Sequence, residues 1–484
     1  MTQTLASSLP LDAFARIVGA KGIITDADDI APWLTDWRGR YHGHSAAIIA
    51  PATTEEVAAC VRIAAEHTVP LVPQGGNTSM VGGATPPEDG SALILSLRRM
   101  NSIRSISPAA NQAVCEAGVI LSTLHEAAEQ AGRRFPLSLG AKGSATIGGL
   151  ISTNAGGTQV LRHGTMRGLV DGIEAVLPDG SIHAGLVALK KDNRGYDLKQ
   201  LLIGAEGTLG IVTAATLRLV PLVSASATAW FGMDRPHDAL KLLRVLERRL
   251  GPIIEGFEVM AADAVGNVIA HIPDTRPPLS TLAPWNALIE FDLSGMGDDG
   301  RGRMEAVLAD IMADETLGVR DAAIAQNEAQ SRAFWHIRET IPEAERAAGF
   351  PIPFDVSVPI DDMPDFMLDA AAACVARFPG TTATSYGHLG DGNVHFHVRA
   401  PAGTPDFTAW FNDTGLDIRR YVHDLVVAAG GSISAEHGIG QSKRAELARL
   451  GPPARVHALR AIKQALDPQG LMNPGKLIPL ASEG

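Results

Sequence analysis

The sequence predicts an α+β protein built from more than one domain. At 484 residues the chain exceeds the roughly 250–300 residues that one hydrophobic core usually serves. Up to Pro221, strand and helix patterns alternate with glycine-rich loops. After Pro221, amphipathic helices alternate with strand-like runs, which is typical of helices packed on one face of an antiparallel sheet. We therefore expect an N-terminal region with its own core and a second, α+β region.

The N-terminal region opens with a strand–helix–strand unit. Residues 46–50 are a short apolar strand, and Thr53 with Glu56 forms a capping box that starts a helix. A second strand at 69–72 runs directly into a glycine-rich loop. Other elements expected in this region are strands at 92–97, 112–117, 173–177 and 181–184, a helix at 121–131, and a strand that ends at Pro221.

The second region carries longer amphipathic elements. Four of its segments are predicted as helices and two as strands. The predicted helices and strands are helices at 236–250, 301–313, 328–348 and 361–378, and strands at 253–260 and 286–293.

Composition excludes several classes of protein. A net charge of −12 and the lack of any Lys/Arg-rich run argue against nucleic-acid binding. The three cysteines form no Cys-x-x-Cys pattern, so neither a disulfide framework nor a thiolate metal site is expected. The first eight residues lack the pattern of a signal peptide, and no 18-residue apolar run indicates an integral membrane segment. These observations predict a cytoplasmic protein.

Three glycine tracts, at 74–79, 140–157 and 204–210, lie within about 140 residues of one another. Glycine lets backbone N–H groups approach an anion closely, and a diphosphate ligand such as FAD needs several such loops. None of the tracts has the G-x-G-x-x-G, P-loop or G-x-S-x-G pattern. Each loop taken alone is also compatible with an ordinary turn, whereas together they favour a cofactor cradle.

A cluster of histidines follows the second region's helices. His395 and His397 share one face of a predicted strand, and the Gly-Asp-Gly-Asn turn returns His388 to their side. Glu436 and His437 follow some forty residues later. Imidazole and carboxylate ligands suit Zn²⁺ and its first-row neighbours, with one base left over. The alternative is that these histidines are separate surface or core residues.

These motifs resemble a known family. Residues 73–78, 138–157 and 204–211 are similar to the FAD domain of the vanillyl-alcohol oxidase type, and residues 388–395, 434–440 and 473–476 to the FAD-linked oxidase C-terminal half. Within this family the chain resembles the D-2-hydroxyacid dehydrogenases, which include flavin-type D-2-hydroxyglutarate and D-lactate dehydrogenases. The resemblance implies a two-subdomain VAO/PCMH-type FAD-binding domain plus an α+β cap domain with an antiparallel sheet.

The resemblance also implies domain limits and residue roles. The FAD-binding domain would span 1–221, including an N-terminal helical segment at 1–40. The cap domain with the metal site would span 222–440, and a segment at 441–484 would return to the FAD domain. The implied FAD-binding residues are Pro73, Gln74, Gly75, Gly76, Asn77, Thr78, Ser79, Gly140, Ala141, Gly143, Ser144, Gly148, Gly149, Asn154, Gly156, Glu206, Gly207, Ile211 and Asn473. Because the first loop contains no histidine, the flavin is expected to be non-covalent.

The implied chemistry is metal-assisted oxidation of a D-2-hydroxy acid to the 2-oxo acid, with hydride passing to flavin N5. A divalent metal such as zinc would bind His388, His395 and Glu436, and His437 would be the base. Arg338 and His397 would bind the substrate. An alternative for Arg338 is a helix-surface cation paired with Glu339 or Asp355. Electrons would pass to a non-NAD acceptor, either a flavoprotein or a quinone-linked carrier, and the oligomeric state stays open, with a homodimer among the options.

Three departures from the hydroxyglutarate-oxidising relatives bear on the substrate. This chain has Pro342 where they have threonine, Pro353 where they have lysine, and His397 where they have asparagine. Losing a hydroxyl and an ammonium group removes two partners for a carboxylate, which favours a substrate with one carboxylate, or with a different tail, over 2-hydroxyglutarate. The alternatives are a D-2-hydroxyglutarate-specific dehydrogenase, a glycolate-oxidase-like subunit, and a non-redox flavoprotein of the same fold.

Overall fold

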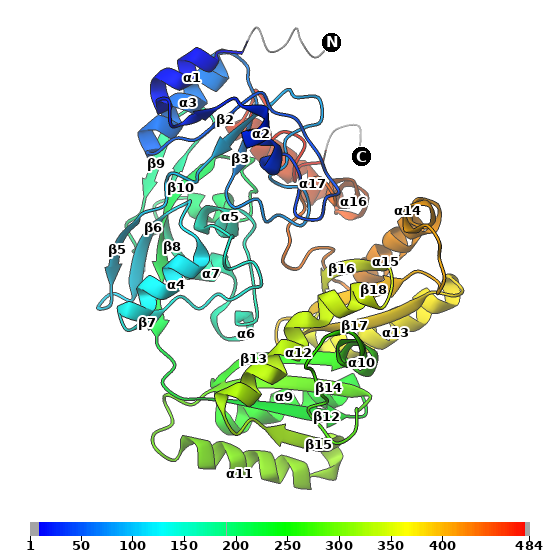
Figure 1. Cartoon of the computed structure of the whole chain (residues 1–484). Helices are drawn as coiled ribbons and strands as arrows, with labels where there is room; N and C mark the ends of the chain where they lie inside the picture. Colours follow the sequence, from blue (N-terminus) through cyan, green and yellow to red (C-terminus); the bar gives the residue numbers. More distant parts are fainter. Residues whose placement is uncertain (1–8, 190, 480–484) are drawn as a thin grey trace. The chain divides into compact units, whose positions relative to one another are not determined.

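The computed structural model describes residues 9–189 and 191–479. The chain divides into two compact units, which Figure 1 colours by sequence. Unit 1 contains the chain up to Gly157, then His163–Leu222 and the segment from Glu436 onward; unit 2 contains Thr158–Arg162 and Val223–Ala435. The chain thus returns to unit 1 at Glu436, earlier than the residue 441 expected. The N-terminal octapeptide used above to predict a location lies outside the described residues.

Unit 1 contains a four-stranded sheet built on the predicted strand–helix–strand unit. Its strands lie in the order β1 (Ile23–Ile24), β2 (Ile48–Ile49), β4 (Leu93–Ser96) and β3 (Leu71–Gln74). Strands β2 and β3 both run parallel to β4, with the helix α3 (Thr54–Glu66) as their crossover. The Thr53 hydroxyl accepts the N–H of Glu56 at 3.1 Å and starts this helix.

A second sheet of unit 1 is antiparallel and has its own core. Its order is β5 (Ile103–Ser107), β6 (Gln112–Glu116), β10 (Ile211–Arg218), β8 (Val170–Val176) and β9 (Ile182–Gly185). A short ribbon pairs β7 (Arg133–Arg134) with β11 (Val220–Pro221). The other helices of unit 1 are α1 (Leu11–Val18), α2 (Ala27–Ile30), α4 (Leu121–Gln130), α5 (Ile147–Ser152), α6 (Val160–His163, shared with unit 2), α7 (Met166–Leu169), α8 (Leu198–Leu202), α16 (Arg444–Leu450) and α17 (Pro453–Leu466).

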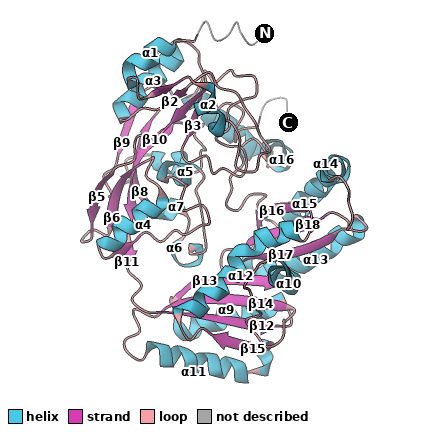
Figure 2. Ribbon diagram, in the orientation of Figure 1, coloured by secondary structure: helices cyan, strands magenta, loops and turns pink. Residues whose placement is uncertain are grey.

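Unit 2 is organised by one seven-stranded antiparallel sheet, shown with its helices in Figure 2. The strands lie in the order β15 (Val319–Ile324), β12 (Ser226–Met233), β14 (Trp285–Asp292), β13 (Ile254–Ala261), β17 (Thr382–His388), β18 (Asn393–Arg399) and β16 (Pro351–Ser357). Its helices include α9 (Pro236–Leu250), α10 (Ala262–His271), α11 (Gly300–Ala313), α12 (Glu328–Ala347), α13 (Met363–Arg377), α14 (Phe407–Trp410) and α15 (Leu416–Ala428).

Helices cover both faces of this sheet, so the expectation of a single covered face was wrong. One face packs on α9, α11, α13 and α15, with Phe231 and Phe257 among its buried residues. The opposite face packs on α10 and α12 through Trp230 and Met260. The reason is that β12, β13 and β14 are buried at nearly every position. Both faces of the sheet are therefore apolar, and each must pack against helices. Within the described ranges, no helix is both long and apolar enough to cross a bilayer.

Candidate functional site

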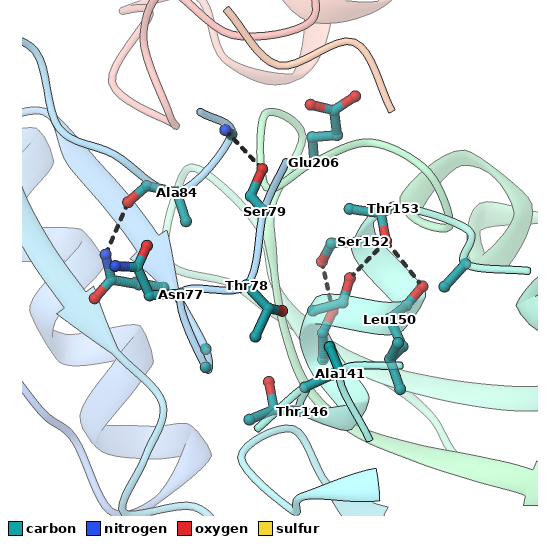
Figure 3. Close-up of a pocket in the computed structure, with 18 of the residues that line it drawn as sticks. Asn77, Thr78, Ser79, Ala84, Ala141, Thr146, Leu150, Ser152, Thr153 and Glu206 are labelled. Carbon is teal, nitrogen blue, oxygen red and sulfur yellow. Dashed lines mark hydrogen bonds between the residues drawn. The ribbon is translucent and has the colours of Figure 1, made fainter. Parts of the chain in front are cut away.

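Unit 1 holds a cavity of about 580 Å³ around which the three glycine tracts meet (Figure 3). Such a volume lies within the usual range of cofactor sites. Its lining is Trp37, Pro73–Met80, Gly83, Ala84, Leu97, Leu139–Ala141, Gly143–Thr146, Gly148–Leu150, Ser152, Thr153, Ala155, Gly156, Glu206, Gly207, Gly210–Val212, Glu436 and His437.

Glycine is required where the first two tracts touch. A Cβ on Gly76 would lie 1.8 Å from the backbone oxygen of Ser144, and one on Gly75 would lie 2.2 Å from Oγ1 of Thr146. Gly140 and Gly143, by contrast, have no atom within 4 Å of such a Cβ. The close approach of two backbones therefore builds the wall, and the open glycines leave backbone groups exposed toward the cavity.

The polar groups of this cavity fit a flavin dinucleotide. Among the described residues, Oε1 of Gln74 and Oγ1 of Thr146 are buried without a hydrogen-bond partner. The amide nitrogen of Gln74 donates to the carbonyls of Trp33 and Ala84 at 3.0 and 2.9 Å, which fixes the orientation of its oxygen. Orphaned buried polar atoms in a cavity are typical of a site that completes its hydrogen bonds with a ligand.

A carboxylate and an amide connect the cavity loops to the C-terminal segment. The Glu206 carboxylate accepts the N–H groups of Ile439 and Gly440, both at 2.7 Å. The amide of Asn473 donates to the carbonyls of Gly83 and Glu206 at 2.9 and 2.7 Å. Burial raises the pKa of Glu206 to about 7, although these two N–H groups oppose the rise. Burial also lowers the pKa of Lys476 to about 8.

Most residues implied as FAD contacts line this cavity, and two do not. Asn154 instead accepts the N–H of Arg167 at 2.9 Å, and Asn473 braces the loops as described. Residues of the cavity that the sequence did not single out include Trp37 and Thr146. Thr146 lies inside the second glycine tract and could have been found there, whereas nothing local marks Trp37.

The histidines come together on a hairpin of unit 2. In the pairing of β17 with β18, His395 lies opposite Tyr386 and His388 lies opposite Asn393, so the tight turn returns His388 to the histidine strand. The rings of His388 and His395 are 5.5 Å apart between centroids.

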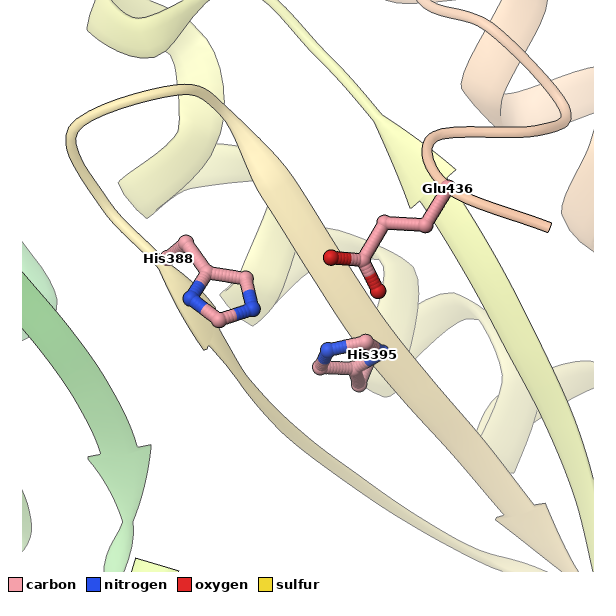
Figure 4. A group of neighbouring side chains, drawn as sticks. All are labelled: His388, His395 and Glu436. Carbon is pink, nitrogen blue, oxygen red and sulfur yellow. The ribbon is translucent and has the colours of Figure 1, made fainter. Parts of the chain in front are cut away.

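Glu436 completes a group of candidate metal ligands (Figure 4). It directly follows Ala435, whose N–H donates to the Asp355 carbonyl at 3.4 Å. One donor atom from each of His388, His395 and Glu436 lies within 4.8 Å of the others. Two imidazoles and one carboxylate form a donor set that fits a divalent first-row metal. His397 is not part of this group, while His437 lines the cavity of unit 1.

A buried carboxylate, Glu258, was missed by sequence reasoning. Its Oε1 lies 2.6 Å from Nδ1 of His388, and its Oε2 accepts Nε–H of Arg338 at 2.6 Å. The Arg338 guanidinium also lies over the Tyr386 ring, 4.9 Å from its centroid. Burial would raise the pKa of Glu258, but the charges of Arg338 and His388 outweigh it and hold the pKa below its ordinary value.

His397 lies in a second buried polar cluster. Its Nδ1 is 3.5 Å from Oε2 of Glu345, and Nε of Arg399 is 3.4 Å from the same oxygen. The other oxygen of Glu345 accepts a hydrogen bond from Asn267 at 2.7 Å. This corner of unit 2 therefore already contains a carboxylate that faces Arg399 and His397.

Two solved structures share the fold of this chain. The chain is similar to an alkyldihydroxyacetonephosphate synthase, with a TM-score of 0.72, 17% identity, and coverage of 97% of this chain and 86% of that one. It is equally similar to p-cresol methylhydroxylase, with a TM-score of 0.72, 16% identity, and coverage of 99% and 97%. Fold and cavity thus define a protein with the vanillyl-alcohol oxidase-type FAD fold.

Comparison of the sequence with protein families identifies the family within this fold. Residues 45–185 match the FAD binding domain, and residues 222–477 match the family described as FAD linked oxidases, C-terminal domain. The chain belongs to this FAD-linked oxidase family and is an FAD-dependent dehydrogenase.

Curated relatives cover nearly the whole chain. D-2-hydroxyglutarate dehydrogenase of Bos taurus is 38% identical over 98% of this chain and 84% of its own length. The Arabidopsis thaliana enzyme of the same name is 38% identical over 96% and 81%. Both are named mitochondrial, which corrects the cytoplasmic location expected from the sequence. The lack of a disulfide pattern, on which that expectation partly rested, does not distinguish these two compartments.

Proposed function

We propose that this dehydrogenase oxidises a D-2-hydroxy acid to the 2-oxo acid with a flavin and a divalent metal as cofactors. The observation that carries the proposal is the convergence of His388, His395 and Glu436, with His437 next in sequence. The cavity of unit 1 would hold the flavin, which would supply the hydride acceptor, and His388, His395 and Glu436 would hold the metal, which would supply a Lewis acid for the substrate hydroxyl.

His437 is the proposed base. A neutral imidazole takes a hydroxyl proton readily near neutral pH. The adjacent Glu436 would hold the metal, and the positive φ angles of Gly438 and Gly440 provide the irregular backbone that lets neighbouring side chains take different roles.

Arg338 is the proposed partner of the substrate carboxylate. A guanidinium donates paired hydrogen bonds to a carboxylate, and Arg338 is buried close to a proposed metal ligand through their shared contact with Glu258. The contact with Glu258 keeps the Arg338 guanidinium in one orientation.

The far end of the substrate is proposed to carry no second carboxylate. Pro342 and Pro353 cannot donate hydrogen bonds from their side chains, and His397 already faces Glu345. Introducing another anion beside Glu345 would be costly in a buried site. The names of the relatives favour the alternative, D-2-hydroxyglutarate, so the substrate must be measured.

Anaerobic flavin reduction by D-lactate, D-malate, D-2-hydroxyglutarate and a longer D-2-hydroxy acid tests this proposal. We expect bleaching by D-2-hydroxy acids and the highest kcat/KM for a monocarboxylate. A clear preference for hydroxyglutarate would overturn the inference about the substrate tail. No bleaching by any of them would leave a non-redox flavoprotein or an inactive glycolate-oxidase-like subunit as the better description.

The metal ligands are tested by metal analysis. His388→Ala and Glu436→Ala should each lose stoichiometric metal, whereas His237→Ala, which removes a histidine paired with Asp365, should retain it. Full metal content in both ligand variants would remove this assignment. The proposed electron acceptor is a flavoprotein or a quinone-linked carrier, to be identified by reoxidation of the reduced enzyme.

A further inference from the structure

Glu258 connects two residues of the proposed site, and neither the family match nor the proposed function gives it a role. It lies on the central strand β13, with its side chain fully buried. One of its oxygens contacts His388 and the other contacts Arg338, each at 2.6 Å. All three residues belong to unit 2.

The sheet register explains this contact between residues 130 positions apart. In the pairing of β13 with β17, Glu258 lies directly opposite His388, and Met260 lies opposite Tyr386. Directly opposed residues of an antiparallel pair project from the same face. Helix α12 covers that face and contributes Arg338.

The chemistry of the contact fixes the imidazole. An ionised carboxylate only accepts hydrogen bonds, so Nδ1 of His388 carries a proton, and in the neutral ring that a metal requires Nε2 keeps the lone pair. A histidine that ligates a metal commonly donates its other N–H to a carboxylate in this way, which sets the ring orientation and increases the basicity of the ligand nitrogen.

We propose that Glu258 is a positioning residue that orients His388 as an Nε2 metal ligand and holds Arg338 for the substrate carboxylate. This inference rests on the proposed function, because it requires a metal at His388. It extends that function by making one carboxylate responsible for both metal affinity and substrate affinity.

A purely packing role does not explain this residue. The neighbouring residues on its face form an apolar cluster that includes Trp230, Met260 and Leu288. A buried carboxylate is costly there unless its partners need it, and well-packed apolar residues often stabilise a core as well or better. The contacts of Glu258 with His388 and Arg338 explain why a carboxylate is present at this position.

The test measures metal affinity in the flavin-loaded, full-length protein. Zn²⁺ affinity is determined by competition with a chromophoric chelator, and the visible spectrum of the Co²⁺-loaded protein reports the ligand geometry. Glu258→Gln should weaken Zn²⁺ binding by about 10- to 100-fold and change the Co²⁺ spectrum while the flavin content stays constant.

Two further variants separate the two roles. Arg338→Met removes the guanidinium but leaves the Glu258–His388 contact, so it should raise KM for the hydroxy acid and keep the Zn²⁺ affinity. Because Glu258→Gln strands a buried guanidinium, the double variant Glu258→Gln/Arg338→Met repeats the metal measurement without that charge. It should show the same loss of Zn²⁺ affinity as Glu258→Gln.

Glu255→Gln is the matched control. Glu255 is a buried glutamate on the same strand, and its ion pair is with Arg162. It should keep wild-type Zn²⁺ affinity. Wild-type Zn²⁺ affinity in both Glu258 variants, or an equal loss in Glu255→Gln, would overturn the positioning role alone. A wild-type protein that binds no Zn²⁺ would overturn the proposed metal site together with this inference.

Discussion

The side-chain amide of Asn473 donates a 2.7 Å hydrogen bond to the backbone carbonyl of Glu206, 267 residues earlier in the chain. Both residues have positive φ angles, 44° and 52°, which are uncommon for residues other than glycine. Asn473 of the C-terminal segment therefore braces the loops that carry the flavin cavity without lining the cavity itself.

Asn473→Ala should weaken FAD binding and lower the Tm. The carbonyls of Gly83 and Glu206 would lose their donor, and leaving buried groups unsatisfied costs about 1–3 kcal/mol. The measurements are FAD titration of the apoprotein and thermal unfolding. Gln464→Ala, an exposed change on α17, is the control; an unchanged FAD Kd in Asn473→Ala would contradict the prediction.

The pH dependence of stability should report Glu206. Its pKa is about 7 in the folded protein against 4.5 as the ordinary value, so the folded state binds this proton more tightly. The resulting stability is fully present below about pH 4.5 and is lost as the pH rises through about 7. In Glu206→Gln, whose side chain stays neutral, this part of the pH dependence should disappear. Tm measured from pH 4.5 to 7.5 checks it.

Glu66→Gln, at the exposed end of α3, is the control for the Glu206 experiment. It should reproduce the wild-type Tm profile. A Glu206→Gln profile that follows the wild type over the same range would show that Glu206 stays ionised throughout.

His437→Ala should reduce the rate of flavin reduction by about 10²–10⁴-fold, the usual contribution of a general base. FAD and metal contents should remain at wild-type levels, because the proposed ligands are unchanged. Stopped-flow reduction by the best hydroxy acid is the measurement, with His457→Ala on the exposed side of α17 as the control. Unimpaired reduction would remove His437 from the base role.

Acid precipitation should release all the flavin into the supernatant. The first cavity loop, residues 73–80, offers neither a histidine nor a cysteine for a covalent bond. Absorbance of supernatant and pellet gives the partition directly. A yellow pellet would show covalent attachment, and the same assay on His437→Ala would test whether that cavity histidine is the point of attachment.

Local patterns in the sequence predicted much of the fold. The helix at 236–250 was predicted with the bounds that α9 has, because its apolar stripe and N-terminal proline are local signals. Strand β12 was missed because it is buried along nearly its whole length without alternation and contains Ala227, Ala229 and Gly232, which have low strand propensity. The same continuous burial, which local patterns do not reveal, explains why helices cover both faces of the sheet.

In the candidate site, too, local features were predicted and long-range contacts were not. The glycine tracts and the histidines are visible in the sequence as local clusters. That the glycine tracts form one cavity and the histidines one metal site was predicted from their spacing and from the family resemblance. The Arg338–Glu258 contact could not be predicted, since it joins residues 80 positions apart and depends on strand register and helix packing. Sequence reasoning named Glu339 and Asp355 as alternative partners of Arg338 and did not consider Glu258.

Because unit 2 is inserted into the chain of unit 1, the ribosome must synthesise all of unit 2 and the segment after it before the cofactor site can close. A nascent chain that ends at residue 435 lacks Asn473 and both backbone N–H groups that bind Glu206. It also lacks Leu471, whose carbonyl accepts the N–H of Leu71 at the start of β3. Loading of FAD should therefore be a late, post-translational event in the maturation of this enzyme.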